Sequence, residues 1–433
     1  MNPTRLVKKI GTCLDKFSMN GFLSIVSGLS PFVLSLSKDS PTVFQQTATR
    51  RLIGVIAILS FLAQPESLFA AQAAPGDPAN LKDLIAKAKA SSHVITLALE
   101  ATEPDVVRAK EQAFEKKFGF PVKLESQPGH HRDMPVKVVE SAKSGRGVID
   151  MWDGGTPLIL GMFRSGNTRR PPWEAIYEGW PLAKKLRAAV PQIGGGPDGA
   201  VLSDHCMHAQ MGNWSLVYNT RRVKPAELKG IKLEDLTSEK WRNRVLWDAQ
   251  ALGLFALPFA PGWDVERMKI FSHNLGANGT KLVAGGSMNL IQSLIQGEGD
   301  VSMVSMNWVL PQKKLGAPLD VAFAEFVLGN STVTCLTNPP VNDPNMTALF
   351  WAWEAFDGNY LEAQISGAGA FRLFQEEEKY LPLVRLARQN GITKMEQVVG
   401  PKTEEDAEKA SEYRKVAIQA MKDGIASKKK IAR

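Results

Sequence analysis

Hydrophobic residues follow two different spacings in the first half of the chain. Apolar runs typical of buried strands occupy residues 93–100, 121–126 and 148–152. Helical spacing of apolar residues occupies residues 79–90, 134–142 and 157–163. A further helix is expected to start at Thr102, where a hydroxyl precedes Pro104 and Asp105, and it carries Val107 and Phe114 on one stripe. This alternation predicts parallel β-α units in a doubly wound α/β sheet.

The same alternation returns further along the chain. Strands are predicted at residues 215–218, 245–247, 281–284, 300–305 and 321–326. Helices are predicted at residues 234–241, 264–275, 288–296, 343–356 and 404–426. We expect Ser287 to cap the helix at 288–296, and we expect the last helix to pack on the first lobe. The Pro- and Gly-rich residues 166–204 are expected to form an irregular segment.

At 433 residues, the chain exceeds one ordinary domain, so two lobes are the natural division. We expect residues 75–205 to form the first part of lobe one and residues 206–320 to form lobe two. Residues 321–433 then return to lobe one and end in C-terminal helices. No internal repeat and no transmembrane helix is evident in the sequence.

The N-terminal residues have the pattern of a targeting segment. Arg50 and Arg51 precede an apolar run over residues 52–62 that is too short to span a bilayer, and small residues follow at 70–74. We expect a Sec-type signal peptide over residues 50–74, with a twin-arginine signal as the weaker alternative. A signal peptide begins close to its basic residues, so residues 1–49 are interpreted as an extension from a misplaced start codon.

Candidate ligand residues are those expected at the carboxyl ends of strands, where doubly wound sheets bind ligands. An aromatic face beside a carboxylate suits an amine cation or a flat ring, whereas helix starts can hold a carboxylate or phosphonate on backbone N–H groups. The candidates are Glu100, Thr102, Trp152, Asp153, Thr156, Trp214, Asp248, Ser287, Asn289, Asn307, Trp308 and Glu325. Each Trp can instead pack in a core, and Asp248 can instead cap the turn that follows it.

One stretch resembles a known family. Residues 217–245 read VYNTRRVKPAELKGIKLEDLTSEKWRNRV, and residues 286–301 read GSMNLIQSLIQGEGDV. Both are similar to motifs of extracellular solute-binding proteins of ABC importers, in the branch that holds ferric-iron, polyamine, thiamine and phosphonate binders. Lys232-Leu233 stands where that family usually has Ser-Trp, and Asn243 stands where it usually has Gly.

The resemblance implies a type II periplasmic binding fold, with two doubly wound lobes joined by a hinge. It implies a monomer in the periplasm that captures a small polar organic solute between its lobes and delivers it to an ABC permease in the inner membrane. It implies no enzymatic activity and no cofactor. Signalling to a membrane receptor instead of feeding a permease stays open.

Composition narrows the alternatives. Residues 1–74 carry seven Lys/Arg and three Asp/Glu, so the formal charge of +8 falls to +4 for the remainder, and nucleic acid is not indicated as a partner. No Gly-x-Ser-x-Gly, Walker or His-Glu-x-x-His motif is present, so a secreted enzyme on the same scaffold is the weaker alternative.

Metal binding is a second alternative. Ferric sites of this branch draw on adjacent tyrosines, because a hard cation prefers phenolate and carboxylate oxygen, and no two tyrosines are adjacent here. His205, Cys206 and His208 have metal-ligating side chains, and His130-His131 lie in another predicted loop, but an ordinary loop explains both clusters. Cys206 can pair with Cys335 in an oxidising compartment, and the sequence leaves that pairing open.

Overall fold

The computed structural model describes residues 77–98, 104–127, 133–211, 214–329, 331–367, 371–372, 381–394 and 397–432. All of these belong to one of the two units into which the chain divides, Gln72–Arg433. The predicted extension at 1–49 and signal peptide at 50–74 lie outside the described residues. So do the candidate ligand residues Glu100 and Thr102 and the pair His130-His131.

The first sheet is built mainly from the first half of the sequence. Its strands are β1 (Val94–Leu97), β2 (Lys123–Ser126), β3 (Met151–Gly155), β4 (Thr168–Arg169), β5 (Cys206–Met211) and β12 (Ser331–Thr337). Their order is β2-β1-β3-β12-β4, and β5 also pairs with β12. β1 runs parallel to β2 and β3, whereas β12 is antiparallel to β3, β4 and β5. Most of the sequence between 94 and 155 therefore forms the predicted β-α units.

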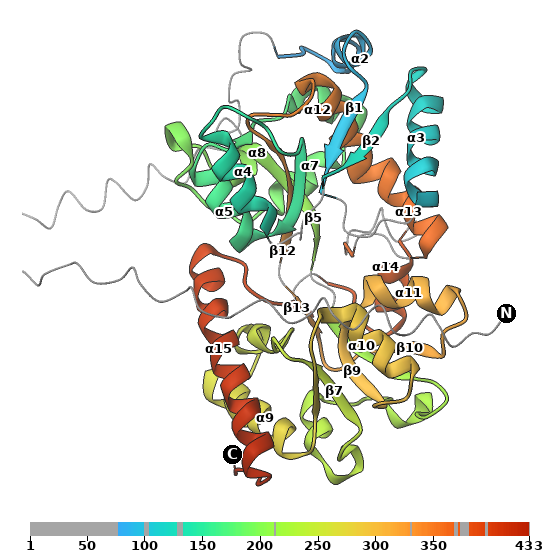
Figure 1. The fold of residues 1–433 in the computed structure, drawn as a ribbon, viewed down its shortest axis with the longest axis vertical. Coiled ribbons are helices and arrows are strands. Elements are labelled where there is room, and N and C mark those ends of the chain that lie inside the picture. Colours follow the sequence, from blue (N-terminus) through green and yellow to red (C-terminus); the bar gives the residue numbers. More distant parts are fainter. Residues whose placement is uncertain are drawn as a thin grey trace, which may run out of the picture. The chain divides into compact units, whose positions relative to one another are not determined.

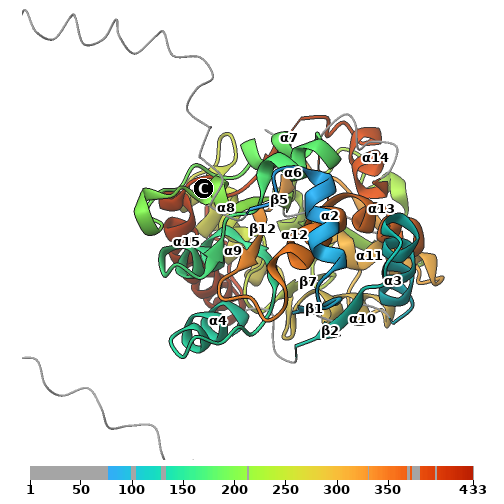
Figure 2. The ribbon, with the colours of Figure 1, turned by 90° about the horizontal axis from the view of Figure 1, so that it is seen from above.

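Helices cover both faces of this sheet. They are α2 (Leu81–Lys89), α3 (Pro104–Phe118), α4 (Met134–Ala142), α5 (Thr156–Arg164), α12 (Pro344–Trp353), the π-turn η8 (Glu354–Gly358) and α13 (Asn359–Ser366). α2 and α12 lie side by side, as Figure 2 shows. Their apolar residues join a core that includes Phe114, Trp351 and Trp353. A separate core, which includes Trp152, Ile159 and Phe163, forms between the sheet and α5.

Cys206 and Cys335 form a disulfide between β5 and β12. The two residues are direct partners in the antiparallel ladder, and their Cα atoms lie 4.4 Å apart, within the range that a disulfide spans. Both are fully buried. The pairing that the sequence left open is therefore present.

The second sheet is built from later residues. Its strands are β6 (Trp214–Asn219), β7 (Val245–Asp248), β8 (Lys281–Val283), β9 (Val301–Ser305), β10 (Leu319–Ala322), β11 (Val327–Leu328) and β13 (Val398–Val399). Their order is β13-β11-β6-β9-β7-β8, and β10 also pairs with β6. β7 runs parallel to β8 and β9, whereas β6 is antiparallel to β9, β10 and β11.

The helices around the second sheet are α9 (Val265–Ala277), α10 (Gly286–Ile295), α11 (Met306–Lys314), α14 (Pro382–Gln389) and α15 (Glu404–Ser427). The prediction that α15 packs on the first lobe is wrong for most of its length, since its main contact is with α9 (Figure 1). A Cβ atom at Gly276 or Gly424 would collide with the facing backbone, so glycine permits this close approach. Only a smaller contact joins α15 to α5.

The chain passes three times between the two sheets, the third time between β12 and β13, which pairs with β11 in the second sheet. It leaves the first sheet after β5 and enters the second at β6, as predicted for residues 206–214. It returns between β11 and β12, later than predicted, because residues 319–328 form two strands of the second sheet. The structure is thus a mixed α/β fold with two sheets, which confirms the predicted fold class.

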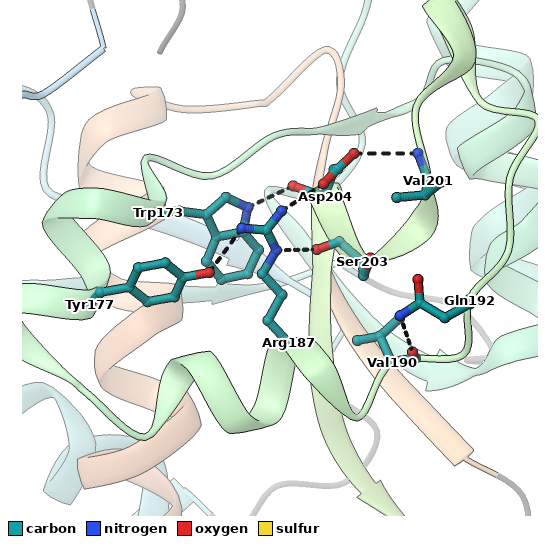
Figure 3. A network of polar contacts seen from close by, with 8 residues as sticks. All are labelled: Trp173, Tyr177, Arg187, Val190, Gln192, Val201, Ser203 and Asp204. Atoms are coloured by element: carbon teal, nitrogen blue, oxygen red, sulfur yellow. Dashed lines mark hydrogen bonds and ion pairs between the residues drawn. The ribbon is translucent and has the colours of Figure 1, made fainter. Parts of the chain in front are cut away.

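Residues 166–204 are more ordered than predicted. They contain α6 (Trp173–Gly179), α7 (Ala183–Ala188), the 3-10 turn η3 (Pro197–Gly199) and α8 (Leu202–His205). Arg187 holds them together by donating to Tyr177 Oη at 2.9 Å, Ser203 O at 2.7 Å and Asp204 Oδ1 at 2.6 Å (Figure 3). Its guanidinium also lies over the Trp173 ring. Pro172 precedes α6, a position where proline does not disturb a helix.

Two further local predictions are corrected. Residues 234–241 form two 3-10 helices, η5 (Leu233–Thr237) and η6 (Glu239–Trp241), because the extended backbone of Ser238 separates them. The remaining short 3-10 helices are η4 (Pro225–Glu227) and η7 (Leu254–Phe259). Ser287 does not cap α10, because the helix starts at Gly286, two residues before the predicted start, and its N-cap is Gly285.

Candidate functional site

Strand directions bring the carboxyl ends of both sheets to the crossing segments. In the first sheet, β5 is parallel to β3, so β5 reaches its crossing at the edge where β3 ends. In the second sheet, β6 begins at Trp214, which pairs with Ser305 at the end of β9. β11 also ends beside Trp214, at Leu328. The crossings from β5 to β6 and from β11 to β12 therefore join the carboxyl-end edge of one sheet to that of the other, and this junction is the candidate site.

Three helices that directly follow strands at these edges start without a capping side chain. They are α5 after β3, α10 after β8 and α11 after β9. Their N-cap residues are Gly155, Gly285 and Ser305, and none makes a side-chain cap hydrogen bond. The first N–H groups of a helix have no partner within the helix, and they carry the positive end of its dipole. This arrangement can bind the oxygen atoms of an acidic or polar group.

Hydrogen bonds near the crossings connect the elements of the site. Thr156, the first residue of α5, donates from its hydroxyl to Ser331 O at 3.1 Å, where β12 begins. Gln210, near the end of β5, accepts on its side-chain oxygen from Asn307 Nδ2 at 2.8 Å. Asn307 lies in the first turn of α11. This second bond joins an element of the first sheet to one of the second.

Several predicted site residues come together at this junction. Thr156, Trp214 and Asn307 lie at the crossings, and half-buried Trp308 follows Asn307 in α11. Trp214 packs edge-on against Phe255, with ring centroids 5.5 Å apart.

Ser287 and Asn289 lie at the start of α10, after the outer strand β8. The side-chain amide of Asn289 donates to Ala284 O at 2.9 Å. A Cβ atom at Gly285 would collide with that amide, so the Asn289 side chain lies directly over the start of the helix. Both residues are thus near the uncapped N–H groups of α10.

Trp152 and Asp153 are neighbours on opposite faces of β3, although both were expected at its carboxyl end, facing the ligand site. Trp152 pairs with Cys335 and points into the core under α5, where it is 1% exposed. Asp153 is exposed, and it shares a face with its cross-strand partner Thr334. Asp153 therefore offers a ligand far more surface than Trp152 does.

Two other predicted residues support the scaffold. Asp248 is 2% exposed and accepts from the backbone N–H of Gln250 at 2.7 Å, so it caps the turn after β7. Glu325 accepts from the backbone N–H of Leu233 at 3.0 Å, which holds η5. Neither contact is directed at the junction of the two sheets.

Acidic side chains gather beside Asp153. Lys110 on α3 is nearly buried and donates to Glu354 Oε1 at 2.7 Å and to Glu362 Oε2 at 2.6 Å. Burial disfavours its ammonium form, but the attraction of the two carboxylates outweighs burial and raises the pKa of Lys110. Burial raises the pKa of Glu354 against the attraction of Lys110, and repulsion from Glu362 and Asp153 adds to this rise. This side of the first sheet is therefore rich in carboxylates.

The histidines of the 205–208 segment do not converge. His205 Nδ1 lies 2.9 Å from Thr168 Oγ1, whereas His208 is 1% exposed. Burial, with repulsion from Arg372, lowers the pKa of His208 to about 3, so it is neutral at physiological pH. Among the residues that the structure describes, no group of three His, Cys, Asp or Glu side chains could hold a metal ion.

Another surface groove, of about 430 Å³, lies between α11 and α14. Its cations are used by the scaffold: Lys313 pairs with Asp320 at 2.7 Å, and Lys314 donates to the terminal carbonyls of α13. Within the described part of the chain, no helix is both long enough and apolar enough to cross a membrane.

Sequence reasoning missed Gln210 and the Lys110–Glu354–Glu362 cluster. Gln210 lies in a segment that the sequence predicts only as a crossing. The spacing of apolar residues gives no information on the role of polar side chains there. Lys110, Glu354 and Glu362 are distant in sequence and sit at helical positions that usually face solvent. The one signal in the sequence was that the apolar stripe of α3 includes the position of Lys110, which indicates a buried lysine.

No protein-family model and no curated protein matches the chain. Solved structures do match. An extracellular solute-binding protein from Bordetella parapertussis aligns with a TM-score of 0.54 and 13% identity, over 77% of this chain and 99% of that one. A Bordetella ferric binding protein aligns with a TM-score of 0.50 and 16% identity, over 76% and 98%.

The PBP AgtB from Agrobacterium tumefaciens R10, in complex with agropinic acid, aligns with a TM-score of 0.52 and 13% identity, over 77% and 98%. Each of these chains is covered almost completely, so the likeness concerns the whole two-sheet structure. At such low identity the likeness establishes the fold and not the ligand. The chain has the mixed α/β, two-sheet fold of extracellular solute-binding proteins of the type II periplasmic class.

Proposed function

We propose that this protein is a periplasmic solute-binding protein that captures a small polar organic solute between its two lobes and delivers it to an ABC permease. The observation that carries this proposal is that two passages of the chain, β5 to β6 and β11 to β12, connect the carboxyl-end edges of the two sheets. Two lobes joined near their ligand-binding edges can close on a solute by bending at these crossings.

Closure gives the mechanism its physical basis. A solute that contacts both edges gains its full set of contacts only when the lobes are closed, so its binding shifts the population toward the closed form. The permease can then distinguish the loaded protein from the empty one by shape. The first-sheet side contributes Asp153 and Thr156, and the second-sheet side contributes Ser287, Asn289, Asn307 and Trp308.

The chemistry of the two edges favours an organic solute. The exposed carboxylate of Asp153 suits a cationic group, and the uncapped starts of α5, α10 and α11 suit acidic or hydroxyl oxygens. A solute with both kinds of group would use both features. The buried disulfide agrees with an oxidising compartment such as the periplasm.

A thermal-shift screen of the purified protein tests the proposal. The panel contains putrescine, spermidine, thiamine, aminoethylphosphonate, simple sugars, sugar phosphates, aliphatic and aromatic carboxylates, and ferric citrate. A solute at about a hundred times its dissociation constant stabilises the folded state by roughly 2.7 kcal/mol, which is readily measured. We expect one organic class to stabilise the protein.

Variants of the candidate site make the screen specific. Asn307→Ala should lower the affinity for the stabilising solute by roughly fivefold, since a lost hydrogen bond at a ligand costs about 1 kcal/mol. Asn390→Ala is the matched control, because Asn390 bonds only locally, to Leu386 O on α14. Stabilisation by ferric citrate alone would support the metal-binding alternative. Turnover of any compound would support the alternative that the protein is a secreted enzyme. Equal effects of the two substitutions would place the solute elsewhere.

A further inference from the structure

The backbone of the β5 residue Gln210 is hydrogen-bonded to β12, the other strand beside a crossing. Its backbone N–H donates to Thr332 Oγ1 at 3.2 Å, and its carbonyl oxygen accepts from the same hydroxyl at 2.8 Å. Thr332 lies on β12, the strand by which the chain returns to the first sheet. One side chain of the return strand therefore fixes the backbone of the outgoing strand, next to its crossing.

This attachment lies at an irregularity in the ladder. Gln210 pairs with Thr332 and His208 pairs with Val333, so Ala209 is an extra residue on β5. The Ala209 carbonyl oxygen accepts from Arg372 Nε at 2.6 Å, and Arg372 is 1% exposed. A bulge interrupts the regular pairing of two strands, so the backbone beyond it depends more on side-chain bonds for its position.

The side chain of Gln210 extends this attachment to the second sheet. Its Oε1 accepts from Asn307 Nδ2 at 2.8 Å, across 97 positions of sequence. Asn307 lies in the first turn of α11, which begins directly after Ser305 at the end of β9. A displacement of this turn relative to the crossing strands must therefore stretch or break the Gln210–Asn307 bond.

We infer that Gln210 is a positioning residue that fixes the first turn of α11, and with it the second-sheet half of the candidate site, relative to the crossing strands. The inference rests on the proposed function for its biological meaning. The chain of contacts runs from Thr332 to Gln210 and then to Asn307, so solute contacts at Asn307 are transmitted to the segments that bend on closure. Gln210 itself needs no contact with the solute.

The distance between the lobes in the solute-free protein tests this inference. Spin labels at Lys116→Cys on α3 and Lys269→Cys on α9, both exposed helical positions, report that distance by pulsed electron paramagnetic resonance. The whole chain is used with Cys13→Ser, because Cys206 and Cys335 are bonded to each other. Gln210→Leu keeps the size of the side chain but removes its acceptor.

We expect Gln210→Leu to shift or broaden the distance distribution, and Thr332→Val to do the same. Gln210→Glu retains an acceptor for Asn307 and should restore the wild-type distribution. Gln192→Leu is the control, because Gln192 bonds only to the nearby Val190 O. Circular dichroism confirms that each variant is folded.

The double variant separates positioning from general loosening. If Gln210 acts through Asn307, adding Asn307→Leu to Gln210→Leu should change the distribution no further than either substitution alone. An unchanged distribution in Gln210→Leu, or additive changes in the double variant, would overturn the inference. The measurement needs no solute, so a failed solute screen would count against the proposed function and leave this result intact.

Discussion

The polar groups at the two ends of β3 differ in how far the chain itself satisfies their hydrogen bonds. Before the strand, buried Asp150 accepts from the backbone N–H groups of Thr96, Val341 and Asn342 and from the Asn342 side chain, at 2.6–2.9 Å. Toward the other end of the strand, Asp153 is exposed, and Gly155 leaves the start of α5 without a side-chain cap. The first end is saturated by the chain itself, whereas the second presents groups that a ligand can use.

Helix starts elsewhere in the chain differ in the same way, since some have a capping side chain and others do not. The helices α2, α9, α12 and α15 begin with capping side chains, which are Asn80, Asp264, Asp343 and Thr403. α12 follows β12, which is antiparallel to β3, so α12 begins at the edge opposite to α5. Some other helices, such as α4, α6 and α14, also start without a side-chain cap, so α5, α10 and α11 are distinguished by starting uncapped at the crossing edges, where a ligand can accept from their N–H groups.

The largest effect is expected at the saturated end. Asp150→Ala leaves three backbone N–H groups and one amide in a buried site without their acceptor, so the free energy of unfolding should fall by about 3–5 kcal/mol. Asp153→Ala, at the open end, should change it by about 0.5 kcal/mol or less. Urea denaturation followed by circular dichroism measures both. Similar losses for the two variants would contradict the distinction between the two ends.

The next effect separates the two faces of β3. Trp152→Ala removes a ring buried under α5 and should lower the free energy of unfolding by about 3–5 kcal/mol. The same denaturation experiment measures this loss. A variant that stays within about 1 kcal/mol of wild type but no longer binds the stabilising solute would instead make Trp152 a ligand residue.

A smaller effect is expected at the capped helix starts. Asp343 accepts from the N–H groups of Asn345 and Met346, both at 2.9 Å, so Asp343→Ala should cost about 1 kcal/mol of stability. Its affinity for the solute should match that of the wild type, because α12 begins away from the crossing edge. Thermal denaturation with and without solute gives both values, and a loss of affinity would link α12 to the site.

The smallest effect has the opposite sign. Ser305→Asp supplies a capping carboxylate at the start of α11 and should stabilise the solute-free protein by about 0.5–1 kcal/mol. The same carboxylate takes N–H groups that we assign to the solute, so affinity should fall. Ser305→Ala is the control, because it removes the hydroxyl without adding a carboxylate. A protein that is stabilised and binds as tightly as the wild type would exclude α11 from the site.

The sequence alone predicts the alternating strands and helices well, but it predicts poorly which of these elements pack against each other. The helix expected at 134–142 is α4 with the same bounds, because its apolar spacing and its flanks are both local signals. The amphipathic pattern of α15 shows that one face is buried, but it carries no information on whether α9 or the first sheet covers that face. The contact at Gly276 and Gly424 decides this, and it joins residues distant in sequence.

The candidate site was predicted only in outline. Strand ends could be located to within a few residues, but a shift of one residue reverses the face of a strand, and this decides between Trp152 in the core and Asp153 at the surface. Gln210 was missed because its importance comes from Thr332 and Asn307, which only the folded chain brings to it. Local sequence patterns locate the ends of the strands, but tertiary contacts decide which residues at those ends belong to the site.

Hydrogen exchange, measured by mass spectrometry with and without the solute found in the screen, tests the central claim most directly. If the solute binds between the carboxyl-end edges of the two sheets, amide protection should rise at the starts of α5, α10 and α11 together. The capped starts of α2, α9 and α15 should change little. Protection confined to one sheet, or centred on the groove between α11 and α14, would contradict a site shared by the two edges.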